Sequence, residues 1–367
     1  MATRSRVVET SFRFGSGRYV QESGAAKRLP AELTRLHATR PFIFGGKTAL
    51  SLACPTVEAA LQAADMPYSI HEYTGFCCVQ TCEELMSTPA FAAADAVVGI
   101  GGGNVCDAAK YMAVKSDRPV ILIPTSSATC ACFTPLSVTY TKDFRRAGSF
   151  HHDREVNGVL ADMDFLCQQP ERLLAAGVYD AAAKLIEIEQ RVRDIPEDEV
   201  DVGLNASYAL SRHTYERMFA LMPEAVKALE KQESSSKALY DLVYLAVAAT
   251  GVISGMARGS NQCAVAHKIY DLSRELFPAP IKDFLHGEIV AIGLLAQLYY
   301  NGRADEIEAF AADMRSHGLP TSLPLIGIEP SEANKALLYD RLLASTAMAG
   351  TNEEEHERLT RALAVIW

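Results

Sequence analysis

Three residues in the second half of the chain carry side chains suited to a catalytic metal site. Asp180, His267 and His286 supply one carboxylate and two imidazoles, a set that binds a divalent cation and leaves a coordination position open for a substrate oxygen. The two histidines are 19 positions apart, so they belong to different helices or turns. Because a single histidine has many structural roles, a purely structural role for each stays the alternative interpretation.

A glycine-rich segment marks a candidate nucleotide site in the first half of the chain. Residues 97–110 read VVGIGGGNVCDAAK, which is an apolar strand pattern, three glycines and then a helix pattern. Backbone N–H groups approach a pyrophosphate closely only where no Cβ intervenes, and a helix N-terminus adds a favourable dipole. The spacing departs from GxGxxG, so a tight strand–helix turn without a ligand is the alternative interpretation.

A second loop, rich in hydroxyl groups, follows the next apolar run. Residues 123–138 read IPTSSATCACFTPLSV. Parallel sheets bind ligands beyond the carboxyl ends of their strands, so loops that follow two adjacent strands are expected to line one crevice. An ordinary turn stabilised by serine and threonine side chains is the alternative.

These segments require two kinds of domain to position them. From about residue 40 to residue 162, short apolar runs alternate with glycines and helix-like stretches, which is typical of a parallel sheet covered on both faces. After about residue 170 the strand-like runs vanish, and helical periodicity extends over 206–230, 236–257, 285–300, 304–316 and 331–345. We predict a Rossmann-like α/β nucleotide-binding domain over residues 1–162 and an all-helical metal-binding and substrate domain over residues 163–367.

The composition of the chain indicates which partners and which cellular compartment are expected. A chain of 367 residues with 49% hydrophobic residues suits two domains with their own cores. The formal net charge of -10 argues against nucleic acid as a partner. The nine cysteines form no paired CxxC knuckles, which favours reduced thiols in the cytoplasm. No run of 18 apolar residues and no N-terminal apolar segment is found, so we expect neither membrane insertion nor targeting.

Four motifs, in this order, resemble the iron-containing alcohol dehydrogenase superfamily in its glycerol dehydrogenase-like division. They read GGGNVCDAAK, PTSSATCACFTPLSV, LLAAGVYDAAAK and FLHGEIVAIG, and the resemblance extends over essentially the whole chain. It implies a dehydroquinate synthase-like fold with a metal in the cleft between two domains. It also implies hydride transfer between NAD(P)(H) and a small hydroxy or oxo compound, in an enzyme that assembles as a homo-oligomer.

The resemblance further implies roles for individual residues. The metal ligands of the family fall on Asp180, His267 and His286. Some branches have a fourth ligand, a histidine, at the position of Lys184, so the match is to the three-ligand branch, in which Zn2+ is usual and Fe2+ is the other candidate. The implied cofactor contacts are Gly101, Gly102, Gly103, Asn104, Asp107, Thr125, Thr134, Leu136 and Tyr140.

Two departures from the family pattern bear on substrate and cofactor. Cys130 stands where glycerol dehydrogenases carry an aspartate, and loss of that carboxylate removes both an acceptor for a polyol hydroxyl and a charge that would repel an anion. We therefore count Cys130 among the catalytic-site residues and expect a 2-hydroxy or 2-oxo carboxylic acid, as in the hydroxycarboxylate dehydrogenase branch. After residues 41–44 the chain has Gly46 and Lys47 rather than an acid for the ribose hydroxyls, which favours NADP(H) over NAD(H).

Three other functions stay open from the sequence. Glycerol or another polyol or alcohol is the alternative substrate within the same enzyme class. A dehydroquinate synthase-like lyase shares a similar HGExVAIG string but needs a basic cluster and a different second loop. A non-catalytic zinc or nucleotide sensor is the third alternative. No side chain stands out as the proton donor.

Overall fold

The computed structural model describes residues 13–367, apart from the side chains of residues 259 and 260, and the chain forms two compact units. The sheet unit comprises residues 13–170 and 219–251, and the helical unit comprises residues 171–218 and 252–367. These units differ from the two domains expected from the sequence, which meet between residues 162 and 163. The expected boundary between a nucleotide-binding and a metal-binding domain stays a prediction. The first 12 residues of the predicted domain 1–162 lie outside the described residues.

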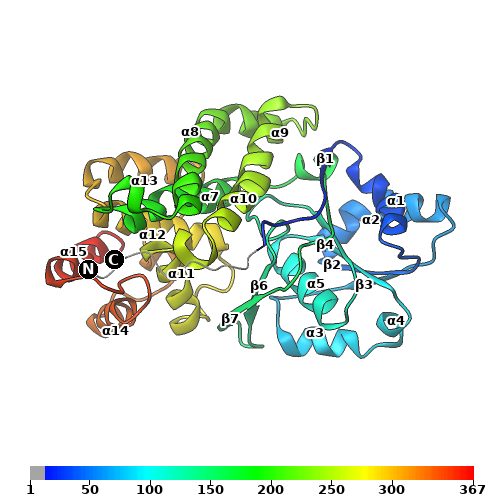
Figure 1. The fold of residues 1–367 in the computed structure, drawn as a ribbon, viewed down its shortest axis with the longest axis horizontal. Coiled ribbons are helices and arrows are strands. Elements are labelled where there is room, and N and C mark those ends of the chain that lie inside the picture. Colours follow the sequence, from blue (N-terminus) through cyan, green and yellow to red (C-terminus); the bar gives the residue numbers. More distant parts are fainter. Residues whose placement is uncertain (1–12) are drawn as a thin grey trace. The chain divides into compact units, whose positions relative to one another are not determined.

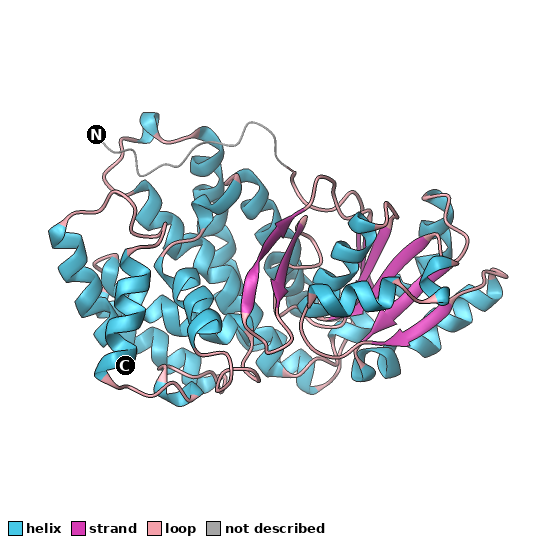
Figure 2. Ribbon diagram, turned by 90° about the horizontal axis from the view of Figure 1, so that it is seen from below, coloured by secondary structure: helices cyan, strands magenta, loops and turns pink. Residues whose placement is uncertain are grey.

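The sheet unit is built on a six-stranded sheet in the order β1-β8-β5-β4-β2-β3. The strands are drawn in magenta in Figure 2. Every neighbouring pair is parallel, and β2, β4 and β5 are buried along their whole length. This confirms the parallel sheet that the apolar runs predicted. The strands are β1 (Tyr19–Glu22), β2 (Pro41–Gly45), β3 (Ser69–Glu72), β4 (Ala96–Gly101), β5 (Val120–Pro124) and β8 (Gly158–Asp162).

Helices cover both faces of this sheet. Alternate strand residues such as Ile43 and Val98 form one core cluster with α1 and α2. On the other face, a Cβ built on Gly99 would lie 2.8 Å from the Cβ of Ala109 in α5, so this glycine lets the helix approach the strand closely. The helices are α1 (Leu29–Arg35), α2 (Lys47–Ala63), α3 (Val79–Met86), α4 (Pro89–Ala92), α5 (Gly103–Lys115) and α6 (Met163–Leu166).

The strand order reverses direction between β2 and β4. After β2 the chain adds β3 on one side of it, and β4 then pairs with the other side of β2 and is followed outward by β5. The loops that follow the carboxyl ends of these parallel strands therefore lie along one edge, at the place where open α/β sheets bind ligands. An antiparallel hairpin that the sequence analysis did not predict follows β5 and consists of β6 (Leu136–Tyr140) and β7 (Arg146–His151).

The helical unit is organised around α7 (Glu171–Val192), which the sequence analysis did not single out (Figure 1). All residues from Leu174 to Ile188 are buried, and α12 packs closely along α7. A Cβ on Gly287 would lie 1.9 Å from the carbonyl oxygen of Ala176, so only glycine permits this crossing. The other helices of this unit are the first part of α8 (Val202–Glu230), most of α10 (Thr250–Met256), α11 (Val265–Leu276), α12 (His286–Tyr300), α13 (Ile307–Ser316), α14 (Glu332–Leu343) and α15 (Glu353–Ala364).

The segment expected to be one helix over residues 236–257 is helical from Lys237 to Met256, with a π-helical turn in its middle. It consists of α9 (Lys237–Tyr244), a π-helical turn (Leu245–Ala249) and α10. Among the described residues, Lys237–Met256 is the one helical segment long and apolar enough to cross a membrane, and 56% of its most apolar window is buried inside the protein. Buried core helices pass the same test, so this is weak support for a membrane span.

Candidate metal centre and nucleotide-binding loops

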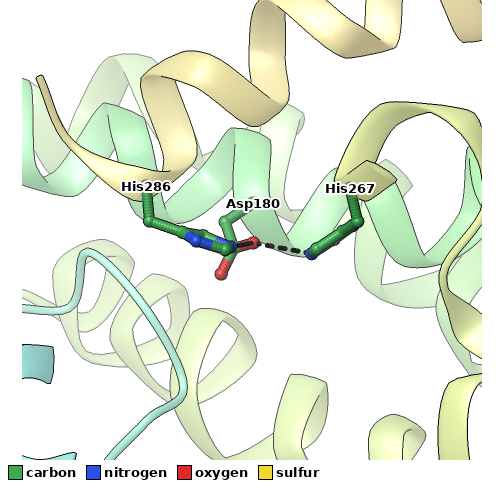
Figure 3. Close-up of side chains that lie close together, drawn as sticks. All are labelled: Asp180, His267 and His286. Carbon is green, nitrogen blue, oxygen red and sulfur yellow. Dashed lines mark ion pairs between the residues drawn. The ribbon is translucent and has the colours of Figure 1, made fainter. Parts of the chain in front are cut away.

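Asp180, His267 and His286 come together in the helical unit (Figure 3). One ligand atom from each lies within 4.8 Å of the other two. Nε2 of His286 is 3.1 Å from Oδ1 of Asp180, and Nε2 of His267 is 3.4 Å from the same oxygen. Asp180 comes from the middle of α7, His267 from the first turn of α11 and His286 from the start of α12. Helix α7 and the two consecutive helices α11 and α12 thus bring the predicted trio to one point.

The surroundings of Asp180 fit a bound divalent cation. Within the described residues, its Oδ1 is buried and makes no hydrogen bond, although it faces both imidazoles. A buried anionic oxygen without a donor is costly unless a cation satisfies it. Burial alone would raise the pKa of Asp180, but His286, His267 and Lys184 hold this pKa well below its ordinary value. An ionised carboxylate is the form of an aspartate that binds a metal.

The residue one helical turn after Asp180 agrees with a three-ligand site. Lys184 is buried on α7, and an ammonium group has no lone pair to offer a metal. Within the described part of the chain, the trio is the one group of three or more histidine, cysteine, aspartate or glutamate residues that could hold an ion. Three protein ligands leave a position open for substrate.

The predicted nucleotide loop lies at the carboxyl end of β4. Helix α5 begins at Gly103 and its N-cap is Gly102, which has no side chain to cap the helix, so the first N–H groups are suited to an anion. A Cβ on Gly103 would lie 2.9 Å from Oγ1 of Thr129 in the second loop. The Thr125 amide donates to the Gly101 carbonyl over 3.2 Å. The two loops are in contact, while the crevice between them and a nucleotide bound there stay predictions.

The remaining predicted cofactor residues lie in different surroundings. Gly46 is the N-cap of α2, and apart from Gly46 and its two chain neighbours no described heavy atom lies within 4 Å of a Cβ built there. Lys47 and Asn104 are exposed. Leu136 is the first residue of β6 and Tyr140 is the last. The Tyr140 ring is buried against the Phe76 ring, with 4.7 Å between the ring centroids. Their contacts with a cofactor stay predictions.

Cys130 and Thr134 lie together at a turn of the second loop. The carbonyl of Cys130 accepts from the amides of Phe133 and Thr134, at 2.9 and 3.2 Å. The Cys130 side chain is partly exposed, and none of the nine cysteines is in a disulfide, which agrees with the expected reduced thiols.

Lys110 is a residue of this region that the sequence analysis missed. It is 1% exposed, and its ammonium donates to the carbonyls of Ala131 at 2.6 Å, Thr134 at 3.0 Å and Leu136. It also pairs with Oδ1 of Asp107 at 2.9 Å. Lys110 thus fastens the second loop to α5. The sequence signal was Asp107 three residues before Lys110 on a predicted helix, but sequence does not show that the pair is buried.

Asp107 also connects α5 to the second loop, through hydrogen bonds to Ser137 and Val138. Its Oδ2 accepts from the amide of Val138 at 3.0 Å, and its backbone carbonyl accepts from the hydroxyl of Ser137 at 2.7 Å. Its buried carboxylate therefore holds the start of the β6–β7 hairpin. The nicotinamide contact implied by resemblance stays a prediction for this residue.

His152 should make the stability of the sheet unit depend on pH. Its Nε2 lies 2.8 Å from Oγ of Ser137, and among residues 13–367 its buried Nδ1 has no partner. Burial, followed by the charges of Lys110, His151 and Arg154, lowers its pKa from 6.5 to about 3. The unfolded chain therefore takes up this proton first, and stability present above about pH 6.5 should be lost as the pH falls towards 3.

Urea denaturation of His152→Gln measures this contribution. The variant should lose less stability than the wild type between about pH 7 and pH 4, because it lacks the histidine that charges on unfolding. Equal losses for the two proteins over this range would contradict the assignment.

Comparisons with known proteins agree with the architecture. The family model described as "Iron-containing alcohol dehydrogenase" matches residues 16–162. Glycerol dehydrogenase of Thermotoga maritima is 32% identical over 322 residues, which cover 85% of this chain and 84% of the relative. Hydroxycarboxylate dehydrogenase A of Escherichia coli K12 is 26% identical over 340 residues, which cover 90% and 89%. The crystal structure of a probable glycerol dehydrogenase from Sinorhizobium meliloti superposes with a TM-score of 0.79 at 23% identity and 98% coverage of both chains, which concerns the fold alone.

Proposed function

Because the chain belongs to the iron-containing alcohol dehydrogenase family, in its glycerol dehydrogenase-like division, it is an oxidoreductase acting on CH–OH groups, and we propose that its substrate is glycerol or another small polyol. The convergence of Asp180, His267 and His286 on one point is the observation that carries a metal-dependent reaction. Relatives named as dehydrogenases give no support to the lyase or the sensor considered from the sequence.

The chain's own residues would divide the work as follows. The carboxylate of Asp180 and Nε2 of the two histidines would hold the cation. When bound, the cation supplies Lewis-acid stabilisation of negative charge on the substrate oxygen. The N–H groups at the start of α5 would hold the pyrophosphate of the nicotinamide cofactor.

The names of the relatives support a polyol, which reverses the order of substrates expected from the sequence. A glycerol dehydrogenase is 32% identical to the chain, whereas the hydroxycarboxylate dehydrogenase is 26% identical. A 2-hydroxy acid is the second candidate, and the observation that favours it is Cys130, an uncharged side chain at the family's polyol-binding aspartate. Preference for NADP(H), a homo-oligomeric assembly and a cytoplasmic location stay predictions.

A kinetic screen tests this proposal. The purified protein with added Zn2+ or Fe2+ should oxidise glycerol or a related diol with NAD+ or NADP+, and a chelator should abolish the rate. Turnover of 2-hydroxy acids with no turnover of polyols would reject the polyol in favour of the second candidate. No turnover of either class with either cofactor would reject the proposed reaction.

Cys130→Asp should move substrate preference towards polyols. The new carboxylate would accept a hydrogen bond from a second substrate hydroxyl and repel an anionic substrate, so the ratio of kcat/KM for glycerol to that for a 2-hydroxy acid should rise about tenfold or more, roughly 1.4 kcal/mol. Cys130→Ser is the matched control, because it adds polarity without charge. An unchanged ratio in Cys130→Asp would show that this position does not set specificity.

A further inference from the structure

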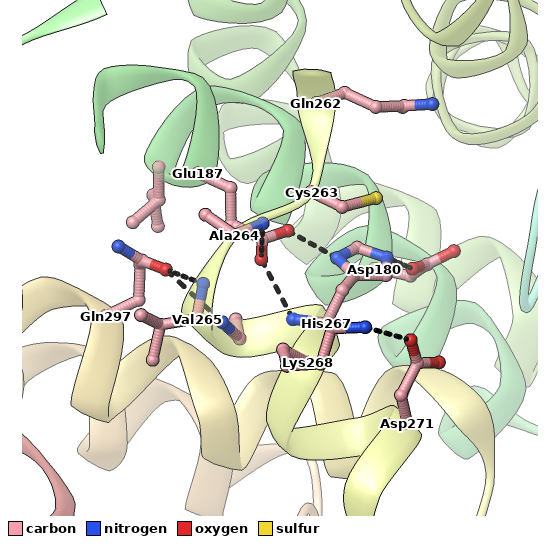
Figure 4. A network of polar contacts seen from close by, with 12 residues as sticks. Asp180, Glu187, Gln262, Cys263, Ala264, Val265, His267, Lys268, Asp271 and Gln297 are labelled. Carbon is pink, nitrogen blue, oxygen red and sulfur yellow. Dashed lines mark hydrogen bonds and ion pairs between the residues drawn. The ribbon is translucent and has the colours of Figure 1, made fainter. Parts of the chain in front are cut away.

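Helix α11, which carries the metal ligand His267 in its first turn, receives its N-terminal cap from two other helices. Its own N-cap residue is Ala264, which has no side-chain acceptor. The amides of Ala264 and His267 donate to Oε1 of Glu187 on α7, at 2.7 and 2.8 Å. The amides of Val265 and Ala266 donate to Oε1 of Gln297 on α12, at 2.8 and 3.2 Å (Figure 4). Four N–H groups that a helix start leaves open are thereby satisfied.

Glu187 makes one contact that Gln297 does not. Its second oxygen, Oε2, lies against Nδ1 of the His267 imidazole. The Glu187 side chain is fully buried. Both of its oxygens contact the start of α11, Oε1 through two amides and Oε2 through the His267 ring. On the far side of the same ring, Nε2 of His267 faces Asp180 at 3.4 Å.

This contact has a defined effect on the histidine as a ligand. A carboxylate oxygen accepts a hydrogen bond, so it favours the imidazole form that carries its proton on Nδ1. That form leaves the lone pair of Nε2 directed at the trio. A carboxylate behind a ligating histidine also fixes the ring orientation and raises its basicity.

We propose that Glu187 is a positioning residue for the metal centre, which orients His267 and sets the imidazole form that can ligate through Nε2. This inference rests on the proposed metal centre at Asp180, His267 and His286. Glu187 lies seven residues after Asp180 on α7, so one helix supplies both a ligand and the support of a second ligand.

The test separates support of the histidine from capping of the helix. Glu187→Gln keeps one oxygen that can cap α11 but places an NH2 group at the other position. If the oxygen caps the helix, the NH2 group donates towards Nδ1 and favours the imidazole form with its proton on Nε2, which blocks ligation. Gln297→Met is the matched control, because it removes the other half of the cap without touching the imidazole.

Two readouts apply to the full-length wild type and both variants. Zn2+ affinity, measured by competition with a chelator, should fall about 10- to 100-fold in Glu187→Gln and less than about threefold in Gln297→Met. The Nδ1–H proton of His267, observed by NMR of zinc-loaded protein with 15N-labelled histidine, should be present in the wild type and in Gln297→Met. It should shift upfield or vanish in Glu187→Gln.

The outcomes distinguish the two levels of the proposal. Wild-type zinc affinity and an unchanged His267 resonance in Glu187→Gln would overturn the role of Glu187. Equal losses of affinity in both variants would also overturn it, because capping alone would then explain the loss. Failure of the wild type to bind zinc would overturn the metal centre itself.

Discussion

Asp180→Asn is expected to abolish bound metal and to lower kcat by more than about 1,000-fold. The substitution keeps the size of a buried side chain but removes the negative charge that faces Nε2 of His267 and of His286. Lewis-acid stabilisation of the substrate oxygen contributes several kcal/mol, and each 1.4 kcal/mol corresponds to about tenfold in rate. Metal analysis after dialysis and steady-state kinetics measure the two losses.

Two controls make this result specific. The affinity for the nicotinamide cofactor, measured by fluorescence titration, should change less than about twofold, because the predicted cofactor residues belong to the sheet unit. Glu189→Gln is a matched carboxylate on the same helix, and its partner is Arg303 at 2.8 Å rather than a histidine, so metal content should stay at the wild-type level. Retained metal and activity in Asp180→Asn would contradict the ligand assignment.

Lys110→Met should give the largest loss of stability in the sheet unit, about 3–5 kcal/mol, as expected when one partner of a buried ion pair is removed. The buried Asp107 would lose its cation, and the carbonyls of Ala131, Thr134 and Leu136 would lose a shared donor. The second loop should then be less ordered, and its predicted cofactor contacts weaker. Urea denaturation and cofactor titration measure both effects.

A double variant and a surface control test the cause. Asp107→Asn combined with Lys110→Met should be no less stable than Lys110→Met alone, because the uncompensated carboxylate is gone. Lys115→Met replaces an exposed lysine of the same helix and should change stability by less than about 1 kcal/mol. A wild-type urea midpoint and wild-type cofactor affinity in Lys110→Met would rule out the fastening role.

The fold was predictable where the pattern is local. Apolar runs followed by glycine mark β2 and β4, and the parallel sheet follows because both faces of such strands must be buried. The units were harder to predict, because residues 219–251 pack with the sheet unit although they lie far along the chain and look like the helices around them. Helix α7 was not singled out, and its buried residues include Asp180, Lys184 and Glu187, which are residue types that a sequence pattern ordinarily assigns to the surface.

The candidate site was predictable where residue type identifies a residue, and not where a role depends on burial. Residue type and the family resemblance identified Asp180, His267 and His286, and the structure gathers them. Glu187 and Lys110 were missed because their roles depend on burial and on partners distant in sequence, which a charged residue on a helix does not reveal. We expect Cys130 and its neighbours to influence substrate choice, because a change of one side chain in a site can alter preference without altering the fold.

X-ray diffraction data collected at the zinc absorption edge from crystals grown with Zn2+ test the metal centre most directly. We expect one anomalous peak about 2.0–2.2 Å from Nε2 of His267, Nε2 of His286 and a carboxylate oxygen of Asp180. A zinc peak bound elsewhere on the protein, or an empty trio in crystals soaked with excess zinc, would contradict the account.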